Sequence, residues 1–441
     1  MMRSVRRLVA AVVLSALTAG AGVVAGCGSS DNGSGGSGSK SSNGPVTLTF
    51  ANWASAEDPT RPGMLATIKA FEKLHPNITI KSQAISFTDI GKNLVLASRS
   101  GNPPDVAELS GNDTFAVAAT QSLANLNDLL GDVKGQILPQ DITAGTVNGA
   151  WVAMPWTDAP QGMFVNKKLL AKAGIDKPPT TLDEFDSDMA TIKSKLKGVI
   201  PFATDTTNRS FGLASQLPWM KAFGAQPFDA NGKVTSTTPE MQKYLQWIRD
   251  VVSKGYTLPN RKIGDFRPLA AQDKVAFIFD QPLLQGVIQT TNHQTDKQFY
   301  DTWEVTPQPQ GDAGQSFSVP LGHQLVVFKK AVDNGKSQAA AEFVKYLATN
   351  TDAIKNYTIK TESSQPPLKQ TPSELSSILN TPVFTAFQKD IAPTLFNPPY
   401  GPVFSAGFSP AMAGVQNAFT TTNPIDMIAT DMQTNIGQAT A

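Results

Sequence analysis

The alternation of strand and helix patterns from Pro45 to the C-terminus is the feature that most constrains the fold of this chain. Residues 46–50 alternate apolar and polar side chains, as a half-buried strand does. A helical pattern begins near Pro62, a continuous apolar run at 275–279 is typical of a buried strand, and a helix is expected at 337–348. Because strands and helices alternate along the chain, the sequence predicts an α/β fold.

Length and composition fit two globular domains. The chain has 441 residues, of which 40% are hydrophobic and 17% are charged, and a typical domain has about 150 residues. It carries 37 basic and 36 acidic groups, but Arg3, Arg6 and Arg7 lie at the extreme N-terminus, so the rest is slightly negative. A nearly neutral body gives no electrostatic reason to bind nucleic acid. The single cysteine excludes an intramolecular disulfide and a thiolate metal cluster.

The N-terminus predicts an exported, lipid-anchored protein. Residues 1–7 are basic and residues 8–26 are apolar or small, so residues 1–26 would form a signal peptide. The segment from Val24 to Cys27 resembles the bacterial lipobox, which implies that a lipid is attached to Cys27. Residues 27–45 would then be the acylated cysteine and a flexible tether, because Ser, Gly and Asn dominate there. The alternative is a membrane anchor with a free thiol at its end, since an apolar stretch of this length could just span a bilayer.

No catalytic or metal-binding motif stands out. The three histidines, His75, His293 and His323, are far apart and lack metal-ligand spacing. There is no Gly-x-Ser-x-Gly nucleophile elbow, and residues 335–337 resemble a phosphate-binding loop without its first glycine. A carboxylate pair for glycoside hydrolysis can be distant in sequence and stays open. We therefore predict no enzyme, no cofactor and no metal.

Six segments, taken in order, resemble one protein family. Residues 166–175 read Asn-Lys-Lys-Leu-Leu-Ala-Lys-Ala-Gly-Ile, and residues 178–185 read Pro-Pro-Thr-Thr-Leu-Asp-Glu-Phe. Together they resemble the signature of family 1 of the bacterial extracellular solute-binding proteins, the substrate-binding proteins of ABC sugar importers, which include maltose-binding protein. Leu182 stands where many members carry tryptophan. The other segments that resemble the family are 101–106, 123–130, 148–155, 274–282 and 322–348.

The resemblance implies the type II periplasmic-binding fold, in which two α/β lobes enclose a ligand cleft and close on it by a hinge motion. The implied partners are a small-molecule solute, the transmembrane permease of an ABC importer, and the membrane, reached through the lipid anchor. The protein would be a monomer on the extracytoplasmic face of the cell membrane. The chain would cross between the lobes near residues 156–160, 303–305 and 350–360. Lobe one would comprise residues 46–156 and 305–352, and lobe two residues 157–304 and 353–441.

A sugar site needs aromatic rings that stack on the C–H faces and planar polar groups that bind the hydroxyls. Asn52 and Trp53 follow the first strand, at the carboxyl end where ligands bind in open α/β sheets. Trp156 and Asp158 fall at the first implied crossing. From position at strand ends or within the resemblance, the predicted ligand-binding residues are Asn52, Trp53, Glu108, Asn112, Trp156, Asp158, Trp219, Asp280, Gln281, Gly322, His323, Asn397 and Tyr400. For His323, a purely structural role is equally open.

Three functions are compatible with the sequence. The first is a binding lipoprotein that captures a mono- or oligosaccharide for an ABC importer. The second is the same fold with a non-sugar solute, such as a glycerophosphodiester, a polyamine or an iron complex. Arg209 and Arg267 are candidates for binding a phosphate. The third is a secreted glycoside hydrolase.

Overall fold

The computed structural model describes residues 44–441 except residues 230, 362, 399 and 400. The predicted signal peptide, Cys27, most of the tether and Tyr400 therefore lie outside the described residues. Residues 42–441 group into one unit. Within the described part of the chain, no helix is long and apolar enough to cross a membrane.

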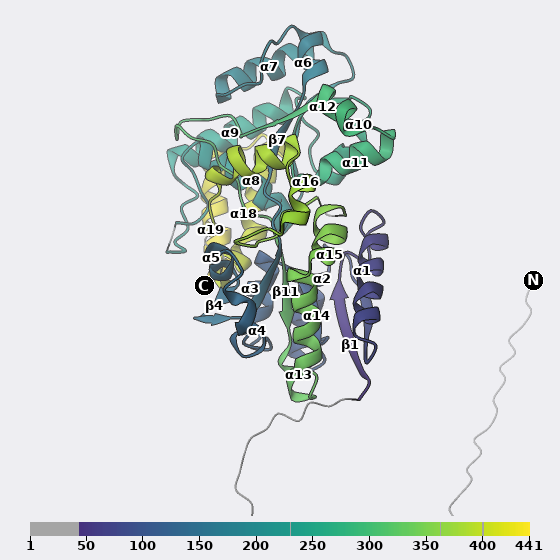
Figure 1. Cartoon of the computed structure of the whole chain (residues 1–441). Helices are drawn as coiled ribbons and strands as arrows, with labels where there is room; N and C mark the ends of the chain where they lie inside the picture. The colour runs from purple at the N-terminus through teal and green to yellow at the C-terminus, as the bar shows by residue number, and fades with distance from the viewer. Residues whose placement is uncertain (1–43, 230, 362, 399–400) are drawn as a thin grey trace, which may run out of the picture. The chain divides into compact units, whose positions relative to one another are not determined.

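A five-stranded sheet forms the first lobe, at the lower end of Figure 1. In spatial order its strands are β2 (Ile78–Ala84), β1 (Val46–Asn52), β3 (Val106–Ser110), β11 (His323–Val327) and β6 (Ala153–Thr157). β1 runs parallel to β2 and β3, whereas β11 runs antiparallel to both of its neighbours. The apolar positions Leu48 and Phe50 of β1 are fully buried, which confirms the strand expected at 46–50.

Both faces of this first sheet are covered by helices. Leu325 and Val327 of β11 pack in one core cluster with residues of α1 and α14, while Val326 packs in another with residues of α2 and α3. Because side chains alternate along a strand, this division means that the strand is buried on both faces. The helical segments of this lobe are α1 (Arg61–Leu74), α2 (Ile90–Arg99), α3 (Gly111–Ala118), α4 (Asn127–Lys134), α5 (Pro139–Ala144), α13 (Lys329–Asp333), α14 (Ser337–Thr349), α15 (Thr351–Ala353), η1 (Ile354–Ile359), η2 (Ser373–Leu375) and α16 (Ser376–Leu379). The same lobe contains a short hairpin of β4 (Thr146–Val147) and β5 (Ala150–Trp151).

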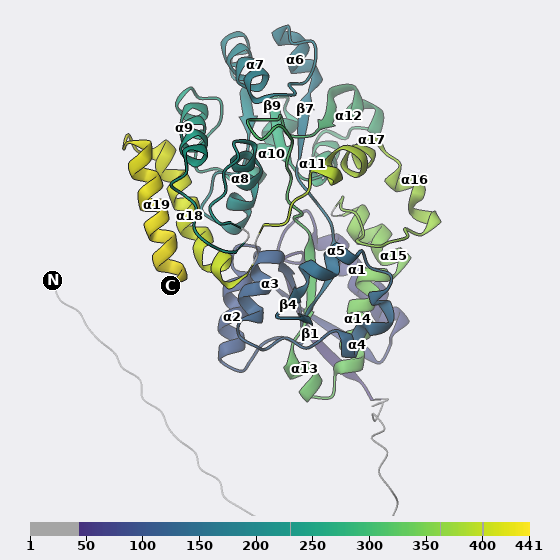
Figure 2. The same ribbon diagram turned by 90° about the vertical axis from the view of Figure 1, so that its left-hand side faces the viewer.

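A four-stranded sheet forms the second lobe (Figure 2). In spatial order its strands are β10 (Trp303–Thr306), β7 (Gly162–Asn166), β9 (Val275–Asp280) and β8 (Ile200–Ala203). Every residue of β9 is buried, as the continuous apolar run at 275–279 predicted. The helical segments of this second lobe are α6 (Lys167–Ala173), α7 (Leu182–Lys195), α8 (Ser210–Ala222), α9 (Pro239–Ser253), α10 (Ile263–Ala271), α11 (Leu283–Asn292), α12 (Asp296–Thr302), α17 (Pro382–Ala386), η3 (Phe387–Ile391), η4 (Ala392–Thr394), α18 (Pro402–Thr420) and α19 (Ile425–Thr440). The predicted α/β fold is confirmed.

Two lobe boundaries drawn from the sequence differ from the sheets and cores of the structure. Val305 belongs to β10 and pairs with Phe164 of β7 in the second sheet, so the chain returns to the first sheet only after Thr306. Residues 354–379 pack into the core of the first lobe, through Tyr357 and Leu375 among others, so that core extends beyond residue 352. Sequence alone could not place these limits, because apolar residues of either lobe look alike.

Candidate functional site

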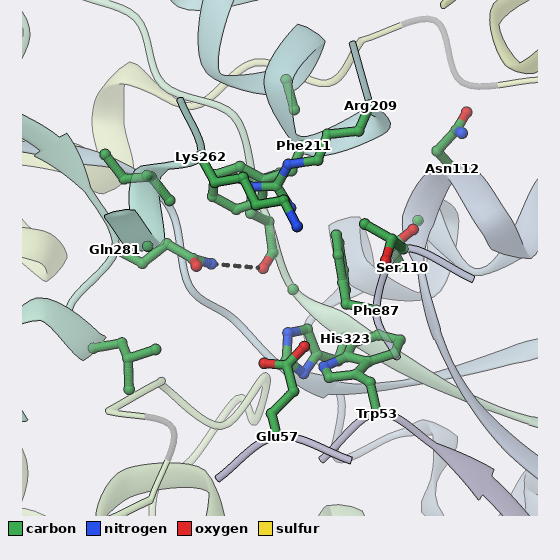
Figure 3. A pocket seen from close by; sticks show the side chains of 18 of the residues that line it. Trp53, Glu57, Phe87, Ser110, Asn112, Arg209, Phe211, Lys262, Gln281 and His323 are labelled. Carbon is green, nitrogen blue, oxygen red and sulfur yellow. Dashed lines mark hydrogen bonds between the residues drawn. The ribbon is translucent and has the colours of Figure 1, made fainter. Parts of the chain in front are cut away.

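A cavity of about 340 Å³ lies between the two sheets, and both lobes line it (Figure 3). It opens where β1 and β3 end, and β11 begins at the same edge because it is antiparallel to β3 and pairs His323 with Ser110. Trp53, Glu57, Phe87, Ser110, Asn112 and His323 line it from the first lobe, and Arg209, Phe211, Lys262, Arg267 and Gln281 from the second. In open α/β sheets, ligands bind at the edge where the parallel strands end.

The loop after β1 carries Trp53 into the cavity. Asn52, the last residue of β1, is fully buried, and its side chain donates to the Phe50 carbonyl and accepts from the Ser55 amide at 2.7 Å. Asn52 therefore holds the turn, and its side chain does not line this cavity. Trp53 packs edge-on against Phe87 with ring centroids 5.1 Å apart.

A buried contact between Glu108 and His323 positions the imidazole at the wall of the cavity. His323 Nδ1 lies 3.0 Å from Glu108 Oε1, and the Glu108 side chain is fully buried. Burial raises the pKa of Glu108 above its ordinary value, and the pairing with His323 opposes this rise only in part. The His323 ring also packs edge-on against Trp53, at 4.7 Å between centroids. The predicted residue Glu108 thus acts behind the cavity wall, through His323.

Aromatic rings from the two lobes meet across the cavity. Phe87 and Phe211 lie edge to face with centroids 6.4 Å apart. The guanidinium of Arg209 lies over both rings, 5.8 Å from the centroid of Phe87 and 5.0 Å from that of Phe211. Phe87 follows β2 as Trp53 follows β1, so a strand-end argument applied to β2 would have found it. Glu57 and Lys262 carry no sequence signal that marks them.

The second-lobe wall presents arginines that are already paired. Arg209 forms an ion pair with the fully buried Asp205, whose carboxylate also accepts from the Ile263 amide. Arg267 binds Asp280 through two hydrogen bonds of 2.8 and 2.9 Å. The predicted residue Asp280 is fully buried and holds Arg267 rather than lining the cavity. These arginines therefore supply oriented N–H donors while adding little net charge.

Five of the predicted ligand residues line this cavity: Trp53, Asn112, Gln281, Gly322 and His323. Gln281 donates to the carbonyls of Ala159 and Leu321, at 2.9 and 3.2 Å, which orients its amide at the cavity wall (Figure 3).

Two predicted tryptophans pack in the cores instead. Trp156 is 1% exposed, stacks on Tyr357 at 4.8 Å and donates to the Leu347 carbonyl. Trp219 is fully buried and stacks between Phe185 and Trp247, at 5.6 and 5.3 Å. Neither ring lines the cavity, because each faces the packed interior of its own lobe.

Asp158 and Asn397 line a second, smaller cavity of about 50 Å³. This small cavity shares Gly111, Pro320, Gly322 and His323 with the main one. Burial raises the pKa of Asp158 to about 6, and burial together with the charge of Asp158 raises the pKa of Asp141 to about 7. Among the described residues, no three His, Cys, Asp or Glu side chains gather as metal ligands.

Sequence and structure comparisons identify the family. The family model of the bacterial extracellular solute-binding proteins matches residues 57–354. The chain belongs to this family. This solute-binding protein is 36% identical to the diacetylchitobiose binding protein DasA of Streptomyces coelicolor over 117 residues, 26% of this chain and 27% of DasA. It is 27% identical to an uncharacterised ABC transporter extracellular-binding protein of Pyrococcus horikoshii over 195 residues, 42% of this chain and 43% of that protein.

The comparison with solved structures confirms the fold. Maltose-bound T. maritima MalE3 matches the solute-binding protein with a TM-score of 0.78 at 20% identity, over 89% of this chain and 99% of that chain. The predicted two-lobed periplasmic-binding fold is therefore correct. The alignments with DasA and the Pyrococcus protein are shorter, since this chain spans about a quarter of DasA and less than half of the Pyrococcus protein.

The burial of Trp219 predicts that replacing it changes stability and not ligand affinity. Trp219→Phe should lower the free energy of unfolding by about 1–3 kcal/mol, because volume is lost from a packed core. Loss of an indole N–H that has no hydrogen-bond partner among the described residues offsets part of this cost. Urea denaturation measures the change. A fivefold or larger loss of affinity for a carbohydrate that binds the wild type would contradict this assignment.

The raised pKa of Asp158 predicts a pH-dependent stability. As pH rises from about 4 to about 6, the unfolded chain loses the Asp158 proton while the folded chain keeps it, so the free energy of unfolding falls. Asp158→Asn removes this penalty and should be more stable than wild type by about 1–3 kcal/mol at pH 8, and equally stable at pH 4. Urea denaturation at both pH values checks it, with the exposed Asp333→Asn as matched control. The same difference at both pH values would exclude this role of Asp158.

Proposed function

We propose that this chain is the substrate-binding lipoprotein of an ABC importer and that it captures a carbohydrate, a mono- or oligosaccharide, between its two lobes. The observation that carries the proposal is the composition of the main cavity. Trp53, Phe87 and Phe211 offer ring faces and edges, and Asn112 and Gln281 offer planar amides. A sugar ring needs both kinds of group, because it has apolar C–H faces and a rim of hydroxyls.

The balance of charge in the cavity supports a neutral solute. The cations at its walls are Arg209, Lys262 and Arg267, and the carboxylates at or directly behind its walls are Glu57, Glu108, Asp205 and Asp280. A polyamine would favour several carboxylates without cations, and a phosphodiester would favour arginines not already held by aspartates. A polyamine and a phosphodiester therefore fit these walls less well than a polyhydroxyl compound.

The relatives support the same class of solute. DasA is named for binding diacetylchitobiose, and the MalE3 structure holds maltose. The Pyrococcus relative is named as part of an ABC transporter. We extend these properties to this chain as a proposal: the protein would bind a carbohydrate for transport and would not catalyse a reaction.

Capture would occur by closure of the lobes. Contacts across the cavity already tie the lobes: Phe87 faces Phe211, and Ser405 of α18 donates to the Asn112 side chain at 3.0 Å. A bound sugar that contacts both walls would favour the closed arrangement, and a permease can distinguish the closed from the open arrangement. The protein would act as a monomer on the extracytoplasmic face of the membrane.

The proposed stacking role of Trp53 predicts a loss of carbohydrate affinity when its ring is removed. The protein lacking residues 1–27 would first be screened against mono-, di- and trisaccharides, glycerophosphodiesters and polyamines by thermal shift, since a ligand at 100 times its Kd stabilises by about 2.7 kcal/mol. Trp53→Ala should weaken binding of the responding sugar at least tenfold, or about 1.4 kcal/mol, by calorimetry.

Trp247→Phe is the matched control, because Trp247 belongs to the second-lobe core and not to the cavity. It should leave the Kd within twofold. A response to a phosphodiester or a polyamine alone, with silence to every sugar, would overturn the carbohydrate assignment and keep the fold.

The proposed lipid anchor predicts that membrane attachment depends on one sulfur atom. In a bacterial host, the full-length protein should partition into the detergent phase of a Triton X-114 extraction, because its acyl chains are apolar. Cys27→Ser should move it to the aqueous phase or leave an unprocessed precursor. Mass spectrometry of the mature N-terminus checks the modification directly. Detergent partitioning that survives the substitution, with the signal segment retained, would instead favour the membrane-anchor alternative.

A further inference from the structure

The small cavity beside the main one brings together two carboxylates and a side-chain amide. Asp141 comes from α5, Asp158 from the segment between β6 and β7, and Gln324 from β11. The volume of about 50 Å³ has room for a group of the size of one or two waters. Three elements that are distant in sequence thus direct polar side chains into one small space.

Two of these acceptor atoms are buried without a partner among the described residues. Gln324 is 7% exposed, and its Oε1 atom is buried without a hydrogen-bond partner. The Oδ2 atom of Asp141 is likewise buried and without a partner. The Asp158 carboxylate lines the same space, and burial raises its pKa. Each unsatisfied buried acceptor costs about 1–3 kcal/mol, so a donor in this space would be strongly favoured.

The electrostatics of the space favour a positive charge over a neutral donor. Asp141 and Asp158 are close enough that the charge of one raises the pKa of the other. The lining contains no Lys or Arg among the described residues. His323 also lines the space, but its Nδ1 atom is engaged by Glu108. A cation between the two carboxylates would relieve their repulsion, whereas a water would leave it in place.

We propose that this cavity binds one small cation through oxygen atoms of Asp141, Asp158 and Gln324. Hard cations such as Ca²⁺ take carboxylate and amide oxygens as ligands, and a primary ammonium donates three hydrogen bonds to the same groups. The cation is therefore either an inorganic ion or the ammonium group of an amino-bearing solute. The second source rests on the proposed function, because such a solute would reach the small cavity from the main one, past Gly322.

Thermal melting at constant ionic strength tests the site without knowledge of the solute. The probes are calcium chloride, sodium chloride and methylammonium chloride, with tetramethylammonium chloride as a cation too large and too poor in donors to fit. At pH 8, at least one small cation should give a saturable rise in melting temperature. At pH 5 its affinity should be at least about tenfold weaker, because both carboxyls are then largely protonated, their pKa values being about 6 and 7.

Substitutions locate the effect. Asp141→Asn should weaken the affinity for the cation, measured from the saturable rise in melting temperature, at least fivefold. Gln324→Met, which keeps the side-chain length and removes the acceptor, should do the same. Asp333→Asn, an equal change of charge on the exposed end of α13, should leave it unchanged. Absence of a saturable rise with every probe, or a rise that both cavity variants retain, would overturn the proposal.

The source of the cation is settled by a pair of matched sugars. If the site takes the ammonium of a solute, the free-amine disaccharide chitobiose should bind more tightly than N,N′-diacetylchitobiose, and Asp141→Asn should remove the difference. If calcium or sodium alone stabilises the protein, the ion is inorganic. Binding of neutral sugars is measured in the same samples, so failure of the carbohydrate assignment and failure of the cation site give different results.

Discussion

The insertion of β11 between β3 and β6 is the constraint on which the main cavity depends. β11 comes from the segment that returns from the second lobe, and its antiparallel register places Leu325 opposite Glu108 and His323 opposite Ser110. The His323 imidazole can then reach the Glu108 carboxylate behind it and the Trp53 ring beside it. A register shift of one residue would turn these side chains to the other face of the sheet and remove the floor of the cavity.

Buried pairs of polar side chains then give the two walls their fixed geometry. Glu108 holds His323 in the first lobe, and Asp205 and Asp280 hold Arg209 and Arg267 in the second. Such pairs contribute little to stability, because the cost of removing both charges from water offsets most of their attraction. Their value here is orientation: each cation or ring is held before a ligand arrives, so little conformational entropy is lost on binding. Neutral hydroxyl groups are well matched by donors that are oriented and already charge-balanced.

The sequence predicts the parts of the site that follow from strand position. Trp53 and Asn112 could be found because parallel strands end at a common edge, and Gln281 because it follows the buried strand β9. The structure places Trp156 and Trp219 in the cores, which the sequence could not show, since a tryptophan suits a sugar site and a core equally well. α8 is apolar around most of its surface, so its sequence does not tell which face Trp219 occupies. Lys262 and Glu57 depend on how two lobes approach one another, which no local pattern records.

Gly322 is one of the residues shared by the main and small cavities, and it lies where two segments of the chain cross. A Cβ atom on this residue would lie 2.1 Å from the Thr157 carbonyl oxygen, so any side chain would force apart the two segments that cross there. Asp158, which follows Thr157, pairs through its backbone with Gln365. The segment of Gln365 is thus a third segment at the same place. Three passages of the chain therefore lie within hydrogen-bonding or van der Waals distance between the sheets. The proposed closure of the lobes on a solute would need rotation at such crossing segments, because the packed cores on either side resist deformation.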